Sequence, residues 1–219
     1  MEISNKTLAS LLVLAIVVSV AGTFLSLSRS SRSGITGYYV SNDTGTTSVN
    51  VGSITSLRFD VNAINFGSGS VNSTGGFTNC TMFINGTGST TITQTGCTGF
   101  NTTNLAGDFV LENAGTTYIN VTMNSSANSS TFIGGGGAGF DNPVFKFTIT
   151  NNETGSCLIT VNYPSWSDSN LIFGNQSQIC GNLSPIDTVD TLQIGVYVAI
   201  PLNSLTGSRT ATFLAQGTG

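Results

Sequence analysis

The pattern of hydrophobic and polar residues divides the chain into one long apolar run and a series of short alternating segments. The run from Leu8 to Leu27 contains no charged residue. At 1.5 Å per residue a helix of this length is about 30 Å long, which matches the hydrocarbon core of a bilayer. We therefore predict an N-terminal hydrophobic helix within residues 1–30, long enough to be transmembrane.

After this run the pattern becomes that of β-strands. In Ser56–Ala63, the side chains of Leu57, Phe59 and Val61 alternate with polar ones, as expected for a half-buried strand, and a slip of phase predicts a bulge near Ala63. Similar short strands are predicted at Tyr38–Val40, Ser48–Val51, Cys80–Ile84, around Ile92, and at Asp108–Glu112, Thr117–Met123, Val144–Thr150, Cys157–Tyr163, Leu171–Phe173, Thr191–Ile200 and Ser208–Ala215.

The strands are separated by segments rich in Gly, Ser and Asn, of which Gly67–Gly76 and Asn124–Gly139 are predicted to be loops. No helical periodicity follows residue 30. The predicted fold class is mainly β, with an N-terminal hydrophobic α-helix followed by an antiparallel immunoglobulin-like β-sandwich. The predicted domains are the helix at 1–30, a hinge at 31–37 and an extracellular β-sandwich domain at 38–219.

The composition excludes several classes of function. Only 7 % of the residues are charged, with six Lys and Arg in total. The chain therefore lacks the basic patch that binding of nucleic acid requires. The chain has no His, which removes the commonest general base and the commonest metal ligand. We therefore expect no enzyme activity, no cofactor and no metal. A secreted carboxylate hydrolase is the remaining enzymatic hypothesis, and it predicts a deep cleft with two facing carboxylates.

The four cysteines follow a hydrophobic leader, which favours disulfides outside the cytoplasm. Three pairings are available, and we favour Cys80–Cys97 and Cys157–Cys180 because each closes a short local loop. Four free buried thiols are the alternative. A zinc site is disfavoured because no two cysteines have the close spacing that such sites use.

Asn-x-Ser/Thr sequons recur along the whole chain, which predicts an N-glycosylated surface protein, although a chain so rich in Asn, Ser and Thr also produces them by chance. A further one begins at Asn5. The candidate glycosylation sites are Asn42, Asn72, Asn79, Asn85, Asn101, Asn120, Asn124, Asn128, Asn152, Asn175 and Asn182.

The N-terminal run also fits a cleavable signal peptide. Lys6 precedes an apolar stretch at Leu8–Val18, and Ser19 and Ala21 form a small-x-small cleavage site. Because the apolar run continues past this site, we favour retention of the helix. Ala15, Ser19 and Thr23 recur every four residues, and such a stripe lets helices approach closely, although small residues are also common in membrane spans.

Trp166 lies close in sequence to Tyr163 and Pro164. Exposed aromatic side chains grouped in this way are typical of carbohydrate-binding surfaces, and an outside carbohydrate or host-cell ligand is one partner to consider. The alternative is that Trp166 anchors its loop by packing.

An uninterrupted apolar helix, a short hinge and a sequon-rich β-domain of this size resemble archaeal type IV pilins and archaellins. The resemblance covers the architecture of the whole chain and implies that the helices form the core of a filament coated by β-domains. A weaker likeness, to secreted fibre proteins of the TasA/camelysin kind, lies in Val198-Ala199-Ile200-Pro201, Gly207 and Ala211-Thr212-Phe213.

The sequence therefore predicts a structural subunit of an extracellular surface filament. Its partners would be other copies of the chain, contacted through the N-terminal helix, and the membrane before assembly. The alternative is a monomeric, membrane-anchored surface glycoprotein or adhesin with a single helix in lipid. Both hypotheses place the protein at the extracellular cell surface.

Overall fold

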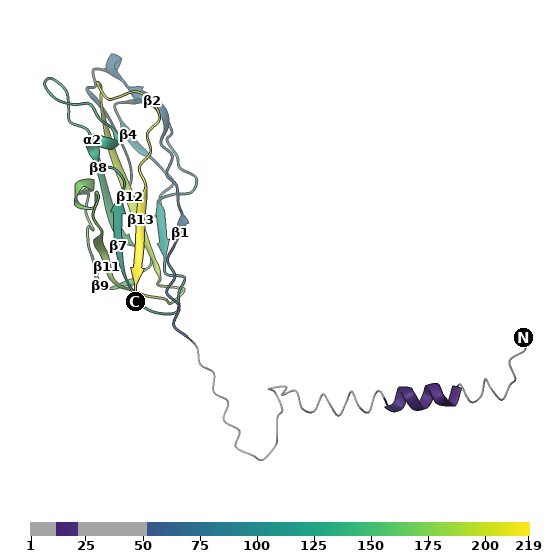
Figure 1. Ribbon diagram of the computed structural model, residues 1–219. Helices are drawn as coiled ribbons and strands as arrows, with labels where there is room; N and C mark the ends of the chain where they lie inside the picture. Colours follow the sequence, from purple (N-terminus) through teal and green to yellow (C-terminus); the bar gives the residue numbers. More distant parts are fainter. Residues whose placement is uncertain (1–11, 22–51) are drawn as a thin grey trace, which may run out of the picture. The chain divides into compact units, whose positions relative to one another are not determined.

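The computed structural model describes residues 12–21 and 52–219 (Figure 1). They belong to two units, Met1–Asn50 and Val51–Gly219, and each is considered by itself. Residues 12–21 are α-helical, in agreement with the predicted N-terminal helix. The rest of that helix, the hinge and the strands predicted before residue 52 lie outside the described residues.

The second unit is mainly β, and its strands pair antiparallel, which confirms the coarse fold class. One sheet contains seven strands: β1 (Arg58–Val61), β3 (Asn79–Ile84), β4 (Thr93–Thr95), β6 (Phe109–Glu112), β8 (Val144–Asn151), β10 (Ser167–Asp168) and β12 (Thr191–Pro201). A second sheet contains β7 (Ile119–Ser125), β9 (Cys157–Val161), β11 (Ser177–Leu183) and β13 (Phe213–Thr218). The third pairs β2 (Gly67–Val71) with β5 (Cys97–Phe100).

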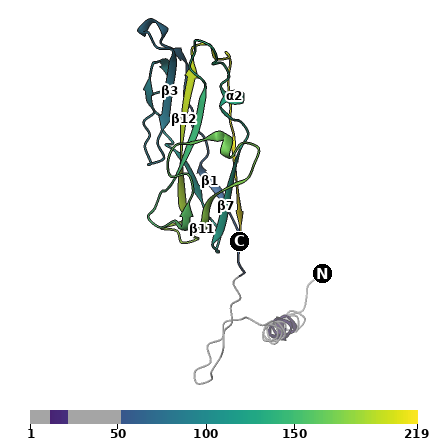
Figure 2. The same cartoon turned by 90° about the vertical axis from the view of Figure 1, so that its left-hand side faces the viewer.

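Strand β12 is the centre of the large sheet (Figures 1 and 2). One of its edges pairs with β8 over residues 192–199. The other edge is divided, because β6 pairs with its first part and β3 with its second. The hand-over from β6 to β3 occurs at Gly195, which is therefore the branch point of the sheet.

The large sheet and the four-stranded sheet face each other across a hydrophobic core, in a sandwich-like arrangement. Phe147 of β8, Ile194 of β12 and Val121 of β7 belong to one buried cluster, which also includes residues of β6, β9 and β11. A second cluster, around Met82 and Phe145, lies beside the other half of β12. Phe213 packs against both clusters, so the C-terminal strand helps to join them.

The turn after β6 carries the chain from one sheet to the other. Asn113 is buried there and organises the turn with three hydrogen bonds. Its side-chain nitrogen donates to the carbonyls of Thr117 (2.9 Å) and Leu183 (3.1 Å), and its side-chain oxygen accepts from the Gly115 N–H (3.1 Å). The two strands that this turn joins, β6 and β7, therefore belong to different sheets and do not form a hairpin.

Strands β2 and β11 differ from the prediction, for different reasons. Gly67–Val71 is strand β2 and not a loop, because its glycines allow close approach to β5. A Cβ on Gly69 would lie 2.5 Å from the Phe100 ring. Strand β11 was missed because two register shifts interrupt its pairing with β7, and such shifts remove the strict alternation that marks a strand in sequence.

Short helical turns replace some predicted loop and strand positions. Leu171 ends the 3₁₀ helix η2 (Ser169–Leu171), which the Asp168 carboxylate caps by accepting from the Asn170 N–H, so the strand predicted at Leu171–Phe173 is wrong. Helix α2 (Ser129–Phe132) lies in a predicted loop and starts with a capping box at Asn128, and η1 (Ser73–Gly75) lies in another. Local capping thus produces helical turns in segments that lack helical periodicity.

Strand boundaries also shift. The bulge in β1 lies between Phe59 and Val61, before the expected position near Ala63. The last strand starts at Phe213, five residues after the predicted start at Ser208. The expected strand around Ile92 is β4, at Thr93–Thr95.

Candidate functional site

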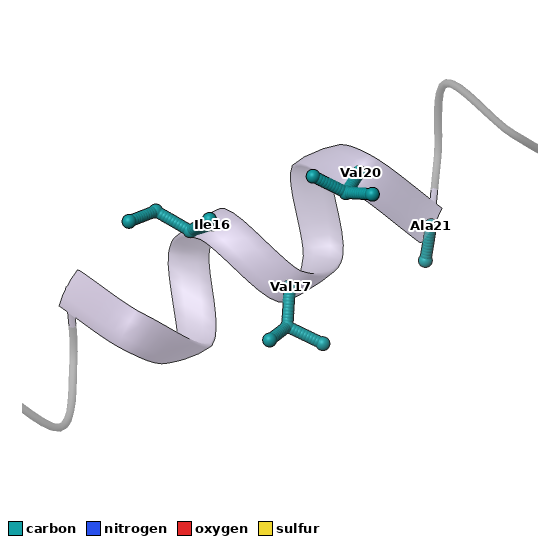
Figure 3. A pocket seen from close by; sticks show the side chains of 4 residues that line it. All are labelled: Ile16, Val17, Val20 and Ala21. Carbon is teal, nitrogen blue, oxygen red and sulfur yellow. The ribbon is translucent and has the colours of Figure 1, made fainter.

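The N-terminal helix presents apolar side chains on all sides. Every residue of 12–21 is exposed. Figure 3 shows one face of it, where Ile16 and Val20 lie one turn apart, as do Val17 and Ala21, with only carbon atoms in the side chains. Seven large apolar side chains are 55–64 % exposed: Leu12, Val13, Leu14, Ile16, Val17, Val18 and Val20. This surface is the strongest candidate for assembly in the described chain.

The predicted packing stripe lies partly within this helix. Ala15 and Ser19 are one turn apart and exposed, whereas Thr23 lies outside the described residues. Among the described residues, no helix is both long enough and apolar enough to cross a membrane. The charge-free run that predicted a span extends beyond residues 12–21 on both sides.

Two disulfides are present, with the pairing that local spacing favours. Cys80 is joined to Cys97 and Cys157 to Cys180, at Cα–Cα distances of 4.7 and 5.8 Å. The first bond ties β3 of the large sheet to β5 of the small sheet, and the second ties edge strand β9 to β11. Disulfides persist in oxidising compartments, so they indicate an extracellular environment.

The sequon asparagines lie at the surface. Asn42 is outside the described residues, and the other ten candidates are exposed or half-buried. The two asparagines that are buried in the described part of the chain, Asn104 and Asn113, are not part of sequons. The distribution is therefore compatible with glycans on any of the ten.

Some sequon amides are already engaged by the protein. The side-chain nitrogen of Asn101 donates to the carbonyl of Asn65 (3.1 Å), and that of Asn152 donates to the Thr191 hydroxyl (2.9 Å). A glycan is attached at this nitrogen. These two sites would have to give up a hydrogen bond on modification. We therefore rank them below Asn85, Asn120 and Asn175, whose side-chain nitrogens make no hydrogen bond to a described residue.

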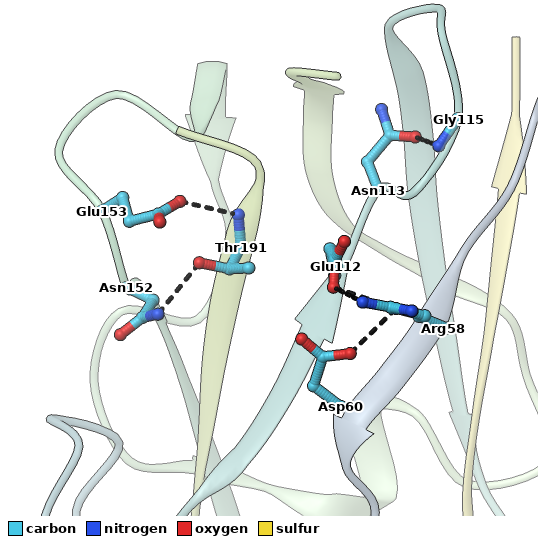
Figure 4. Close-up of polar contacts among 8 residues, drawn as sticks. All are labelled: Arg58, Asp60, Glu112, Asn113, Gly115, Asn152, Glu153 and Thr191. Atoms are coloured by element: carbon cyan, nitrogen blue, oxygen red, sulfur yellow. Dashed lines mark hydrogen bonds and ion pairs between the residues drawn. The ribbon is translucent and has the colours of Figure 1, made fainter. Parts of the chain in front are cut away.

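Several carboxylates of the described residues make polar contacts that support the fold. Arg58 of β1 forms ion pairs with Asp60 of the same strand (Nε–Oδ1, 2.9 Å) and, across the strand pair, with Glu112 of β6 (Nη2–Oε2, 2.7 Å) (Figure 4). Glu153 accepts hydrogen bonds from the N–H groups of Asp190 (2.9 Å) and Thr191 (3.3 Å) at the start of β12. The hollow around Asn65 and Leu105 has no carboxylate in its lining.

Asp108 is buried and fixes the loop that follows β3. Its two carboxylate oxygens accept from the N–H groups of Gly86 (3.0 Å) and Gly88 (2.8 Å). Burial raises the pKa of this carboxyl, and the backbone N–H donors oppose the rise. The carboxylate therefore holds the end of β3 against the start of β6, at the branch point on β12.

Two further carboxyl groups have a raised pKa. The pKa of Glu112 is raised mainly by a hydrogen bond shared with Asp60 and secondly by burial, whereas Arg58 lowers it. The pKa of Asp190 is raised mainly by burial and further by the negative charges of Glu153 and Asp187. In all three groups the folded protein holds the proton more tightly than the unfolded chain does.

These raised pKa values predict tolerance of mild acid. A carboxyl group whose folded pKa lies above its unfolded pKa contributes stability that is complete below the unfolded pKa and is lost as the pH rises through the folded pKa. We therefore expect the free energy of unfolding, measured by urea titration, to rise as the pH is lowered from 7 to about 4.5. Asp108→Asn should reduce this rise, and a steady fall in stability over the same range would contradict the prediction.

The aromatic group predicted around Trp166 has different members. Tyr163 does not join it, because its ring packs in the core against Phe147 (centroids 5.1 Å apart). Trp166 instead contacts Phe83 of β3 and Tyr197 of β12, at 5.9 and 5.7 Å. Sequence proximity could not reveal this group, since its members come from three distant segments. The only signal was that Phe83 and Tyr197 fall between the core positions of their strands.

Comparison of the chain with protein-family models, with curated proteins and with solved structures gives no match. Among the described residues, no group of three or more Cys, Asp or Glu side chains is placed to hold a metal ion. The functional argument therefore rests on the chain's own surfaces: the apolar helix, the disulfide-tied β-domain and the exposed sequons.

Proposed function

We propose that this chain is a structural subunit of an extracellular cell-surface filament and assembles through its N-terminal hydrophobic helix, as the resemblance to archaeal type IV pilins and archaellins implies. The observation that carries the proposal is the exposure of seven large apolar side chains on residues 12–21. A helix that is apolar on all sides has to be surrounded by lipid or by protein. Other copies of the same helix supply such a surrounding.

The β-domain suits the outside of such a filament. Its two disulfides support an extracellular location, and its surface sequons offer attachment points for glycans that would keep a charge-poor domain in solution. We propose that this domain is an immunoglobulin-like sandwich. The support is that its two larger antiparallel sheets enclose one core with alternating inward residues.

The stripe of small residues distinguishes a filament from a single membrane anchor. Close helix packing requires Ala15 and Ser19 to stay small, whereas an isolated helix in lipid accepts leucine at either position. The double variant Ala15→Leu, Ser19→Leu is therefore expected to abolish filaments in negative-stain images of sheared cell-surface material, while the protein remains in the membrane fraction.

Val17→Leu is the matched control, because it enlarges a side chain on the opposite side of the helix from Ala15. It should leave filaments intact. Recovery of the wild-type protein only from detergent-solubilised membranes, with no filaments, would overturn the proposal. That result would favour the membrane-anchored glycoprotein or adhesin.

A further inference from the structure

Three aromatic side chains form a half-buried surface on the outer face of the large sheet. The rings of Phe83 and Tyr197 stack with centroids 5.9 Å apart, and Trp166 contacts both. Their strand neighbours, such as Met82 and Val198, point into the core, so Phe83 and Tyr197 point away from it. Strands β3 and β12, which carry these two residues, lie side by side in Figure 2. We call this group the aromatic surface.

Asn85 lies two positions after Phe83 and directly follows Ile84, the last residue of β3. Side chains two residues apart along a strand share one face and lie about 6.6 Å apart, so the chain leaves β3 with Asn85 close to Phe83. Asn85 is exposed and begins the sequon Asn85-Gly86-Thr87. Its side-chain oxygen accepts a hydrogen bond from the Thr87 hydroxyl (2.7 Å), and its side-chain nitrogen has no hydrogen bond to any described residue. The atom that would carry a glycan is therefore free and close to the aromatic surface.

The backbone around Asn85 is firmly held. Asp108 accepts from the Gly86 and Gly88 N–H groups, and the Thr150 hydroxyl donates to the Gly86 carbonyl. A sugar attached at Asn85 would consequently leave the protein from a fixed position. Fixing one partner in this way lowers the entropy cost of stacking the sugar on the rings.

The spacing between Phe83 and Asn85, with an aromatic residue two positions before a sequon asparagine, recurs in the sequence. In a chain that is 9 % aromatic, about one of twelve sequons would have an aromatic residue two positions before the asparagine by chance. Four do, and the pairs are Phe77 with Asn79, Phe83 with Asn85, Tyr118 with Asn120 and Phe173 with Asn175. Of these aromatic residues, Phe83 is the one whose ring contacts two further rings among the described residues.

We propose that Asn85 carries an N-linked glycan and that its first sugar lies on the aromatic surface formed by Phe83, Trp166 and Tyr197. The C–H face of a pyranose ring is apolar, and it shields aromatic rings from water when it stacks on them. Lys146 pairs with Tyr197 in the sheet register and Asp168 pairs with Lys146, so charged groups border the surface where sugar hydroxyls need partners.

The modification itself requires a glycosyl pyrophosphate donor and a separate transferase. The Asn85 side-chain nitrogen attacks the anomeric carbon of the donor sugar and forms a C–N bond. The bond from that carbon to the pyrophosphate oxygen breaks, the pyrophosphate leaves with the electron pair, and the nitrogen loses one proton to a base. The proposal is independent of filament assembly, because it concerns residues of the β-domain alone.

Trp166 is the only tryptophan in the chain, so its fluorescence reports directly on this surface. The full chain is produced in a host that N-glycosylates secreted proteins and in one that does not, with Asn85→Gln made in both. In the glycosylating host, mass spectrometry should find a glycan on the Asn85 peptide. Quenching of Trp166 by acrylamide should be weaker in the wild-type protein than in Asn85→Gln.

The wild-type glycoprotein should also melt about 2–4 °C above Asn85→Gln from the same host. The two proteins should melt together when made without glycans, which separates the effect of the sugar from that of the substitution. Asn120→Gln, which removes a sequon in the other sheet, is the matched control and should leave quenching of Trp166 unchanged.

Three results would overturn the proposal. They are an unmodified Asn85 in protein whose other sequons carry glycans, equal quenching of Trp166 with and without the Asn85 glycan, and protection of Trp166 by added free oligosaccharide in the glycosylated wild-type protein. The last result would show that the aromatic surface is open and takes sugars from outside the chain.

Discussion

Loss of the two disulfides is expected to lower the free energy of unfolding by about 3 kcal/mol for each bond. The bonds span 17 and 23 residues, and closing loops of this size restricts the unfolded chain strongly. Cys80 and Cys180 are also fully buried, so replacing them with alanine removes core volume in addition to the cross-link. Urea unfolding of the double variants Cys80→Ala, Cys97→Ala and Cys157→Ala, Cys180→Ala measures both losses together.

Reduction of the wild-type protein isolates the cross-link, because the thiols keep their volume. The two bonds should differ in which strands become open to hydrogen exchange when each bond is broken. Cys97 lies in β5 of the small sheet, so loss of its bond should expose β2 and β5 to hydrogen exchange before the rest of the domain unfolds. Loss of the second bond should release edge strand β9 in the same way. An unchanged urea midpoint after complete reduction would contradict the expected contribution.

Most of the sheet strands were predictable because their sequences alternate without interruption. Strands β3, β8 and β12 begin and end within one residue of their predicted bounds, since each pairs over its length without a register shift. Strand β11 shows the opposite case. Its pairing shifts register with both neighbours, so buried Ile179 and Cys180 are adjacent in sequence and no alternation marks the strand.

A candidate surface could be predicted when its residues are neighbours in sequence. It could not be predicted when the fold brings together residues from distant segments. The apolar helix and the sequons can be identified from neighbouring residues alone. The aromatic surface could not, because its rings come from positions 83, 166 and 197. Tyr163 was expected beside Trp166, but its backbone has a positive φ of 64°, and its ring packs in the core against Phe147.

The branch point of the large sheet is the other feature that no local pattern revealed. In the sequence, Gly195 is a single glycine inside a predicted strand, and Asp108 is a carboxylate with no local pattern that sets it apart. Their importance depends on Gly86, whose N–H is bound by Asp108 and whose backbone lies against Gly195. Three positions that are distant in sequence therefore form one structural unit.

Gly195→Ala is expected to cost about 3 kcal/mol of folding stability, because the new methyl group has no space. A Cβ at this position would lie 2.7 Å from the backbone nitrogen of Gly86 and 2.8 Å from the carbonyl oxygen of Ile84. Both contacts are to backbone atoms, which cannot rotate away as a side chain would. Relief requires the end of β3 to leave β12, and this movement pulls Gly86 from the Asp108 carboxylate.

Gly181→Ala is the matched control, since Gly181 is also buried and lies within a strand. The nearest atoms to a Cβ there are 3.4 Å away, in the side chains of Gln178 and Ile159, which is an ordinary contact. This substitution should leave stability unchanged or raise it by about 0.5 kcal/mol, because alanine restricts the unfolded chain. Urea titration of both variants compares them directly, and equal stabilities would refute the role assigned to Gly195.

The Asp108→Ala variant tests whether Gly195 and Asp108 act through the same loop. Alone, it should cost about 2 kcal/mol or more, because it leaves the buried Gly86 N–H without its acceptor and also removes the acceptor of Gly88. Combined with Gly195→Ala, it should cost less than the sum of the two, since the first substitution has already displaced the loop that the second would release. Strict additivity would show that the steric contact at Gly195 and the hydrogen bonds of Asp108 stabilise the branch point independently.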